Sequence, residues 1–156
     1  MLNFPPTVIL RHNRENLRKC SLRGLEKRED LIFLTYPTSP LPDLTHYIVL
    51  TLEGPPLTTA DRHRGLFLID GTWRHAKTMA KIVPPRLVQR SLPSHLRTAY
   101  PRRQDDCPDP LRGLASVEAL YMAYLILERE TDGLLDHYHW KDPFVAKVLD
   151  LKQALM

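Results

Sequence analysis

Four short apolar runs in the first half of the chain constrain its fold more than any other feature. They are rich in β-branched and aromatic residues, nearly continuous rather than alternating, and bounded by turn residues; they cover residues 7–10, 31–35, 47–52 and 66–69. Strands with this pattern are usually buried on both faces, as in a mostly parallel α/β sheet. We therefore predict a single α/β domain over residues 1–156, with a mostly parallel sheet and flanking helices.

Three later segments are predicted to form helices. Residues 72–83 have apolar side chains at helical spacing, a threonine suited to the N-cap and two prolines directly after them. Residues 114–130 are rich in Ala, Leu, Met and Glu, and residues 143–156 are amphipathic. We also expect a short helix within residues 13–27 and a further strand within residues 86–92.

Composition sets limits on the class of protein. The chain has 43% hydrophobic residues, enough for a core, and a formal net charge of +4. This mild basic excess suits a polyanionic partner without identifying one. Cys20 and Cys107 are too few for a structural zinc site, so we expect no metal. No apolar stretch could span a bilayer and no signal peptide is evident, so we expect a cytoplasmic monomer without a membrane partner.

The junction at Asp70 is the first candidate site. Asp70 ends the fourth apolar run, Gly71 permits a tight turn, and Thr72 and Trp73 open the helix. In open α/β sheets, ligands bind beyond the carboxyl ends of strands and against helix N-termini. The indole could stack on a purine, which is worth ~1–3 kcal/mol. The alternative is structural: a helix cap followed by a tryptophan in the core.

Two further features suggest a functional loop. Residues 93–113 are too long for an ordinary connection and carry Arg97, Tyr100, Arg102 and Arg103, which suit phosphate contacts and base stacking. A charged run is also often only a solvated surface. Glu118 lies on the apolar side of the helix predicted at residues 114–130. A buried carboxylate needs partners, and we favour a structural role bracing this loop over a catalytic one.

Several segments, taken together, resemble the DTW-domain family. Residues 70–77, Asp-Gly-Thr-Trp-Arg-His-Ala-Lys, are similar to the Asp-x-Thr-Trp signature of that family, and residues 114–120 are similar to its Leu-Ser/Thr-x-Glu-Ala block. Residues 57–61 and 90–93 are similar to segments of related ribosomal RNA enzymes. Residues 20–25 resemble an early Cys-Thr-Gly-containing segment in those relatives.

The resemblance implies a fold and an activity. The fold is a SPOUT-like α/β domain with a C-terminal trefoil knot. The activity is transfer of the 3-amino-3-carboxypropyl group of S-adenosyl-L-methionine to a uridine or a modified pseudouridine in structured RNA. Methylthioadenosine is released and no metal takes part. The acceptor is a tRNA or a ribosomal RNA, and the Asp-Gly-Thr-Trp form slightly favours tRNA.

The resemblance also assigns roles to residues. Asp70 becomes the candidate base or acceptor-orienting group. The implied cofactor-binding residues are Ser21, Thr72, Trp73, Leu92, Leu114, Ser116 and Ala119. Trp73 and the apolar members of this set line the adenine pocket, and the two serines lie near the amino-acid arm.

Two other interpretations remain open. The first keeps the cofactor and fold but transfers the methyl group, as in a SPOUT-type RNA methyltransferase. The second is a non-catalytic RNA-binding module. The product formed from S-adenosylmethionine separates the first from our main prediction, and cofactor binding separates the second.

Overall fold

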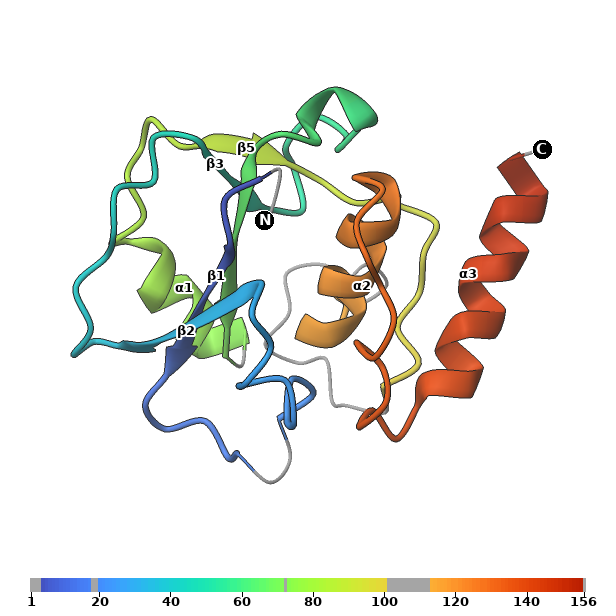
Figure 1. Cartoon of the computed structure of the whole chain (residues 1–156), viewed down its shortest axis with the longest axis horizontal. Helices are drawn as coiled ribbons and strands as arrows, with labels where there is room; N and C mark the ends of the chain where they lie inside the picture. The colour runs from blue at the N-terminus through green and yellow to red at the C-terminus, as the bar shows by residue number, and fades with distance from the viewer. Residues whose placement is uncertain (1–3, 18–19, 72, 101–112, 156) are drawn as a thin grey trace.

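The computed structural model describes residues 4–17, 20–71, 73–100 and 113–155, without the side chains of residues 73, 74, 154 and 155 (Figure 1). Within these described residues, five strands and three α-helices follow one another, with a short 3-10 turn, η1 (Thr59–Asp61), before the fourth strand. The strands are β1 (Thr7–His12), β2 (Leu31–Tyr36), β3 (Tyr47–Leu50), β4 (Gly65–Asp70) and β5 (Val88–Arg90). The helices are α1 (Trp73–Ala80), α2 (Ser116–Ile126) and α3 (Lys141–Leu155).

The strands form one parallel sheet in the order β2-β1-β4-β3-β5, which confirms the α/β prediction. Successive side chains of a strand point to opposite faces, so a strand between two layers is apolar at every position. In β4, Leu66 and Leu68 face one core while Phe67 and Ile69 face the other. This arrangement explains why the apolar runs are continuous.

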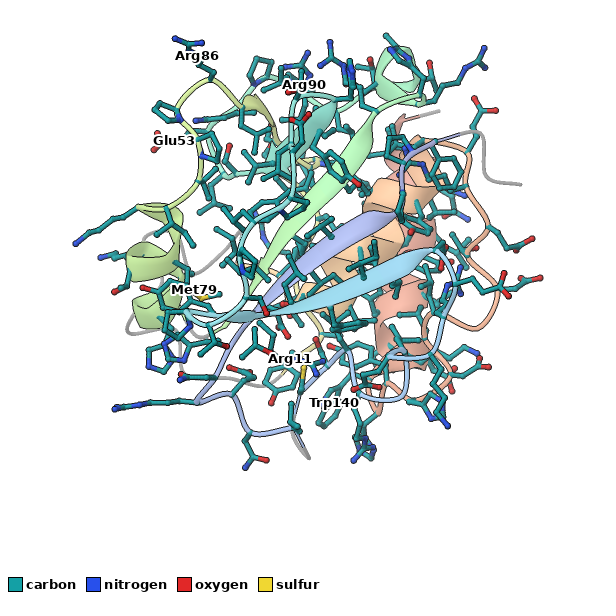
Figure 2. The ribbon with its side chains drawn as sticks, turned by 60° about the vertical axis from the view of Figure 1, so that its left-hand side comes forward. Arg11, Glu53, Met79, Arg86, Arg90 and Trp140 are labelled. Atoms are coloured by element: carbon teal, nitrogen blue, oxygen red, sulfur yellow. The ribbon has the colours of Figure 1, made fainter. Side chains whose placement is uncertain are left out.

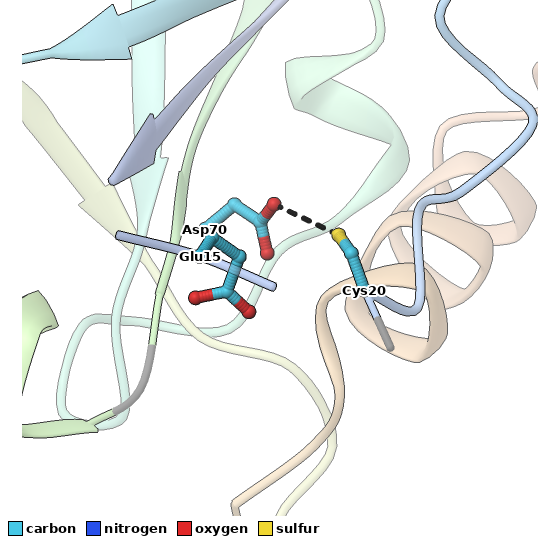
Figure 3. Close-up of side chains that lie close together, drawn as sticks. All are labelled: Glu15, Cys20 and Asp70. Atoms are coloured by element: carbon cyan, nitrogen blue, oxygen red, sulfur yellow. Dashed lines mark hydrogen bonds between the residues drawn. The ribbon is translucent and has the colours of Figure 1, made fainter. Parts of the chain in front are cut away.

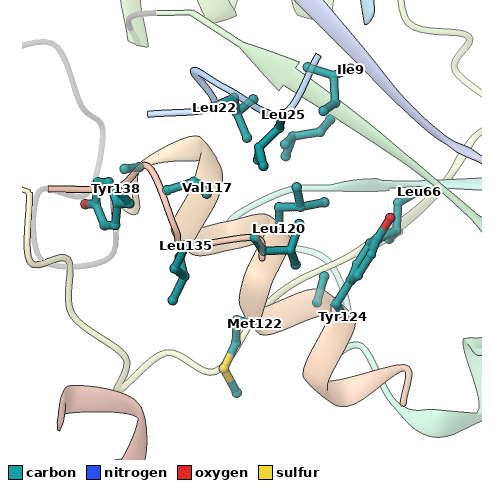
Figure 4. Close-up of a cluster of buried hydrophobic side chains, with 14 of the residues drawn as sticks. Ile9, Leu22, Leu25, Leu66, Val117, Leu120, Met122, Tyr124, Leu135 and Tyr138 are labelled. Atoms are coloured by element: carbon teal, nitrogen blue, oxygen red, sulfur yellow. The ribbon is translucent and has the colours of Figure 1, made fainter. Parts of the chain in front are cut away.

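Helices cover both faces of the sheet (Figure 1). On one face, α1 packs through Met79, which is fully buried, against β1 and β4 (Figure 2). On the other face, α2 packs its buried side chains against β1 and β4, as Figure 4 shows for Leu120 and Tyr124 near Leu66. Helix α3 lies beyond α2, where Phe144 contacts Tyr121 edge-on at 6.0 Å between ring centroids.

The helix predicted within residues 13–27 is wrong. Its described residues, 13–17 and 20–27, form turns and no helix, with Cys20, Leu22 and Leu25 each buried and Leu17 55% exposed. Gly24 has φ of +90°, and a Cβ there would lie 2.3 Å from Cδ2 of His137. Only glycine fits that conformation and that contact, so a continuous helix cannot form here.

The other elements are found as predicted, with shorter or shifted ends. Helix α1 ends at Ala80 rather than Val83, and residues 81–83 continue as tighter i→i+3 turns. Helix α2 covers 116–126 rather than 114–130; after its C-cap, Glu128 adopts φ of +58° and Arg129 N donates to Tyr124 O. Strand β5 covers 88–90 rather than 86–92, and α3 begins at Lys141 rather than Pro143.

The strand order makes the neighbouring strands β1 and β4 the topological switch point of the sheet. The chain leaves β1 toward β2 at one edge of the sheet, and leaves β4 through α1 toward β5 at the other edge. Ligands of open α/β sheets bind at such a switch point, beyond the carboxyl ends of the strands. The C-terminal knot implied by the family resemblance remains a prediction. In the described part of the chain, no helix is long and apolar enough to cross a membrane.

Candidate functional site

Asp70 lies at the switch point, as the last residue of β4. Its register partner on β1 is Arg11, one residue before the end of that strand. The alternation along both strands turns these two side chains toward the face that α2 covers. Asp70 is only 3% exposed, so its carboxylate requires compensating partners.

Three donors from separate segments supply that compensation. Ser116 Oγ donates to Asp70 Oδ1 at 2.8 Å, while Arg11 Nε and Cys20 Sγ donate to Oδ2 at 3.2 and 3.3 Å. Figure 3 shows Cys20 directed at the carboxylate. The serine begins α2, and the cysteine lies in the turns that follow β1. The carboxylate therefore joins β1, β4, α2 and the turn segment at one point.

Arg11 is the positive charge of the site. Burial by itself lowers the pKa of Arg11, but the nearby Cys20, Asp70 and Glu26 outweigh this and raise it, so the guanidinium stays charged. Its Nη1 lies 3.5 Å from Glu26 Oε1, and its Cζ lies 4.6 Å from the centroid of the Phe33 ring. These contacts fix the direction in which Arg11 meets the carboxylate.

Cys20 acts as a thiol donor at this site. Burial and then the charge of Asp70 raise its pKa to about 12, so the sulfur carries its proton near neutral pH. Glu15, Cys20 and Asp70 place one ligand atom each within 4.8 Å of one another (Figure 3). A metal ion there would have to displace the thiol proton and lie beside the Arg11 guanidinium. The chemistry of this set therefore favours a hydrogen-bonded network over a metal site.

The first turn of α2 completes the site. The leading N–H groups of a helix have no partner within it and need acceptors from elsewhere. Ser21 Oγ accepts from Val117 N at 3.1 Å, while Ser116, one residue earlier, donates to Asp70. The structure thus brings together Asp70, the candidate base, with Ser21 and Ser116, which the family resemblance places near the amino-acid arm.

Glu118 binds the loop that precedes α2. It is fully buried, and its two carboxylate oxygens accept four hydrogen bonds of 2.6 to 3.0 Å, from Thr98 Oγ1, Ala99 N, Ala115 N and Tyr138 OH. The first two donors belong to the described part of the 93–113 loop. The predicted structural role of Glu118 as a brace is confirmed for that part.

The apolar residues expected to line an adenine pocket lie around the same helix. Leu92, Leu114 and Ala119 are partly buried and pack against the core on the α2 face. An apolar side chain that keeps an exposed part beside a polar site offers a surface that a flat ring can cover. The three residues therefore share a face with Asp70.

The remaining predicted residues are described to different extents. Arg97 donates from Nη1 to Ser94 O at 2.6 Å, and Tyr100 packs against the core of the α2 face. Trp73 is the first residue of α1, but its side chain is outside the described part of the chain. Thr72, Arg102 and Arg103 lie outside the described residues altogether. Their roles remain predictions.

Arg11 and Cys20 both bind Asp70, but the sequence patterns do not predict either contact. A signal for Arg11 was present, because it lies near the end of the first apolar run and β1 and β4 are adjacent parallel strands. The pairing of Arg11 with Asp70 depends on the order of the strands in the sheet, and the apolar runs do not predict that order. Cys20 approaches Asp70 only through the irregular turns after β1, which periodicity does not predict.

Comparison with known proteins adds one solved structure. No protein-family model matches the chain, and no curated protein matches it. The fold is similar to that of the SAM-dependent rRNA:acp-transferase Tsr3 from Vulcanisaeta distributa, with a TM-score of 0.68 and 24% sequence identity. The match covers 95% of this chain and 80% of that chain. The likeness establishes the fold. The SPOUT and DTW assignments remain predictions based on the motifs.

Proposed function

We propose that this chain is an RNA-modifying transferase. It binds S-adenosylmethionine on the α2 face of the sheet edge and transfers the 3-amino-3-carboxypropyl group to a uridine or modified pseudouridine in structured RNA. The observation that carries this proposal is the convergence of Ser21, Ser116 and the buried Asp70 at the switch point. The similarity of the fold to a solved SAM-dependent rRNA:acp-transferase supports it.

The groups present fit the parts of S-adenosylmethionine. Ser21 and Ser116 supply hydroxyls and helix backbone for the amino-acid arm. Leu92 and Leu114 supply partly exposed apolar surface for the adenine. Arg11 is held by Asp70 and Glu26, and its charge suits the carboxylate of the amino-acid arm as a third partner.

The protein residues then position the acceptor and move its proton. S-adenosylmethionine supplies a carbon activated by its sulfonium leaving group. Asp70 orients the acceptor uridine and takes the N3 proton as that nitrogen bonds to the γ-carbon and the carbon–sulfur bond breaks. General-base assistance of this kind is worth roughly 10²–10⁴-fold. Arg11 holds the carboxylate in place for this step, so most of the rate gain comes from positioning.

The RNA contacts belong to this proposal as well. We propose that Arg97, Tyr100, Arg102 and Arg103 bind the RNA beside the site. The Asp-Gly-Thr-Trp form favours tRNA as the acceptor, whereas the similar solved protein acts on rRNA. Parallel assays with the two RNAs decide between them.

The test measures product and label together. The purified chain is incubated with S-adenosylmethionine labelled in its carboxyl carbon, and with either unmodified tRNA or small-subunit rRNA. We expect methylthioadenosine and labelled RNA in equal amounts. S-adenosylhomocysteine with unlabelled RNA would show methyl transfer instead. Calorimetry that detects no cofactor binding would instead favour a non-catalytic RNA-binding module, and Trp73→Ala should weaken that binding strongly.

A further inference from the structure

Three stacked rings lie at the same edge of the sheet, on the face opposite Asp70. They are Tyr36 at the end of β2, His12 at the end of β1 and His75 in the first turn of α1. The His12 and His75 centroids are 3.8 Å apart with planes at 6°, and the His12 and Tyr36 centroids are 5.4 Å apart at 29°. All three side chains are partly exposed. We call this set the ring stack.

The ring stack adjoins the candidate site through the backbone. His12 directly follows Arg11, which binds Asp70 on the other face. Gly71 directly follows Asp70, and a Cβ at Gly71 would lie 3.4 Å from the Cβ of His75 and 3.5 Å from that of His12. A ligand that reaches Asp70 around this edge therefore passes the ring stack.

The ring stack differs from the core beneath it. Val8 and Leu10 precede His12 on the same face of β1 and are at most 1% exposed. The row of buried apolar side chains on this face of β1 therefore ends before His12. His12 Nδ1 accepts a hydrogen bond from Arg14 N at 3.0 Å, which leaves the proton of the neutral ring on Nε2. Burial, His75 and Arg14 lower the pKa of His12, which favours the neutral form of that ring. Flat and partly exposed rings are surfaces on which nucleobases stack.

We infer that the ring stack binds an unpaired nucleobase of the RNA, next to the nucleotide that enters the Asp70 site. This inference rests on the proposed function. An unpaired base is the fitting ligand because bases inside a duplex already stack on each other, and proteins read single-stranded RNA through aromatic side chains. Arg14 is exposed and its backbone N–H donates to His12 Nδ1, so this arginine brings positive charge suited to a phosphate beside the rings.

The test uses a fluorescent base in place of the unidentified natural one. The probe is a uridine-rich RNA hairpin with 2-aminopurine in its loop, whose fluorescence is quenched when that base stacks on an aromatic ring. The variants are His75→Leu, which removes a ring, and His75→Phe, which restores one. His63→Leu is the matched control, because His63 is an exposed histidine between η1 and β4.

We expect His75→Leu to weaken hairpin binding at least about fivefold and to abolish the quenching, because loss of a stacked base costs ~1–3 kcal/mol. His75→Phe and His63→Leu should bind and quench like the wild type. The melting temperature and the S-adenosylmethionine affinity of each variant show that it is folded. Quenching that survives in a folded His75→Leu protein would overturn the inference, as would a wild-type protein that binds the hairpin without quenching. Quenching without group transfer would refute the proposed function alone.

Discussion

At the scale of single residues, Asp70, which we propose to be functional, differs from the buried Asp61 in its location and in its partners. Both are less than 5% exposed and both bind an arginine, Asp70 through Arg11 and Asp61 through Arg90. Asp61 precedes β4, and its partner Arg90 lies far from Arg11 (Figure 2). Asp70 alone of the two is at the carboxyl end of the strand, and its other donors are a hydroxyl and a thiol, which a ligand can replace. Location and exchangeable partners therefore matter more than burial.

Asp70→Asn tests the role of this carboxylate. The amide keeps the shape but cannot take a proton, so we expect single-turnover group transfer to fall by roughly 10²–10⁴-fold. Calorimetry should show S-adenosylmethionine affinity within about threefold of wild type, since a group used mainly in the transition state affects rate more than binding. Asp61→Asn is the matched control and should lose stability while keeping the rate. An unchanged rate in Asp70→Asn would show that Asp70 is not the base.

At the scale of elements, Glu118 connects α2 with the loop before it and with the segment before α3. Each of its hydrogen bonds has a donor from backbone, threonine or tyrosine, and in the described structure no cation within salt-bridge distance shares its charge. The carboxylate is therefore held by oriented dipoles alone. Replacing such a carboxylate is therefore costly even with the isosteric amide, because every donor is directed at an oxygen.

Glu118→Gln should therefore destabilise the protein. The amide turns its NH2 group toward donors, and two unsatisfied buried groups cost about 2–6 kcal/mol together. Urea unfolding measures this loss, and calorimetry should show weaker S-adenosylmethionine binding because the loop beside Leu114 is released. The exposed Glu53 provides the control, since Glu53→Gln should change stability by less than about 0.5 kcal/mol. Equal midpoints for the two variants would contradict the bracing role.

The ring stack makes the edge of the sheet sensitive to pH. The pKa of His12 is lower in the folded protein than its ordinary value of about 6.5, first through burial and then through His75 and Arg14. Between its ordinary pKa and its lower pKa in the folded protein, His12 binds more protons in the unfolded chain than in the folded protein. The stabilisation that is fully present above about pH 6.5 is therefore lost as the pH falls through the folded pKa. We expect urea midpoints to drop more between pH 7.5 and 5.5 for wild type than for His12→Gln. His75→Gln should show an intermediate drop, and identical drops in all three would contradict this origin.

The sequence predicted the layers of this fold better than its site. Continuous apolar runs require burial on both faces, so the parallel sheet and its flanking helices follow from local pattern. The Asp70 junction and Glu118 were also found, because each interrupts an apolar pattern with a charge. Arg11 could not be placed, since its partner depends on strand order, and strand order depends on packing between distant segments. The turns around Cys20 escaped because Gly24 and His137 meet only in the folded protein.

At the scale of the whole molecule, the net charge of +4 is modest, so the position of the arginines matters more than their number. A weakly basic protein binds RNA specifically only if its charges meet phosphates beside the site. Basic residues also lie far from Arg11, the partner of Asp70, for example Arg86 before β5 (Figure 2). Comparing two pairs of arginines therefore separates a local RNA surface from a general attraction.

The paired variants Arg102→Gln/Arg103→Gln and Arg62→Gln/Arg86→Gln each remove two positive charges. If both arginines of the first pair bind phosphates, the slope of log Kd against log salt should flatten by about 1.4, because each single-strand phosphate contact contributes about 0.7. The second pair is exposed and lies before β4 and β5, so it should leave the slope unchanged. Fluorescence anisotropy from 50 to 300 mM salt measures both. If both pairs of substitutions flatten the slope equally, total charge drives binding. If only the second pair flattens it, RNA binds at the opposite end of the sheet instead.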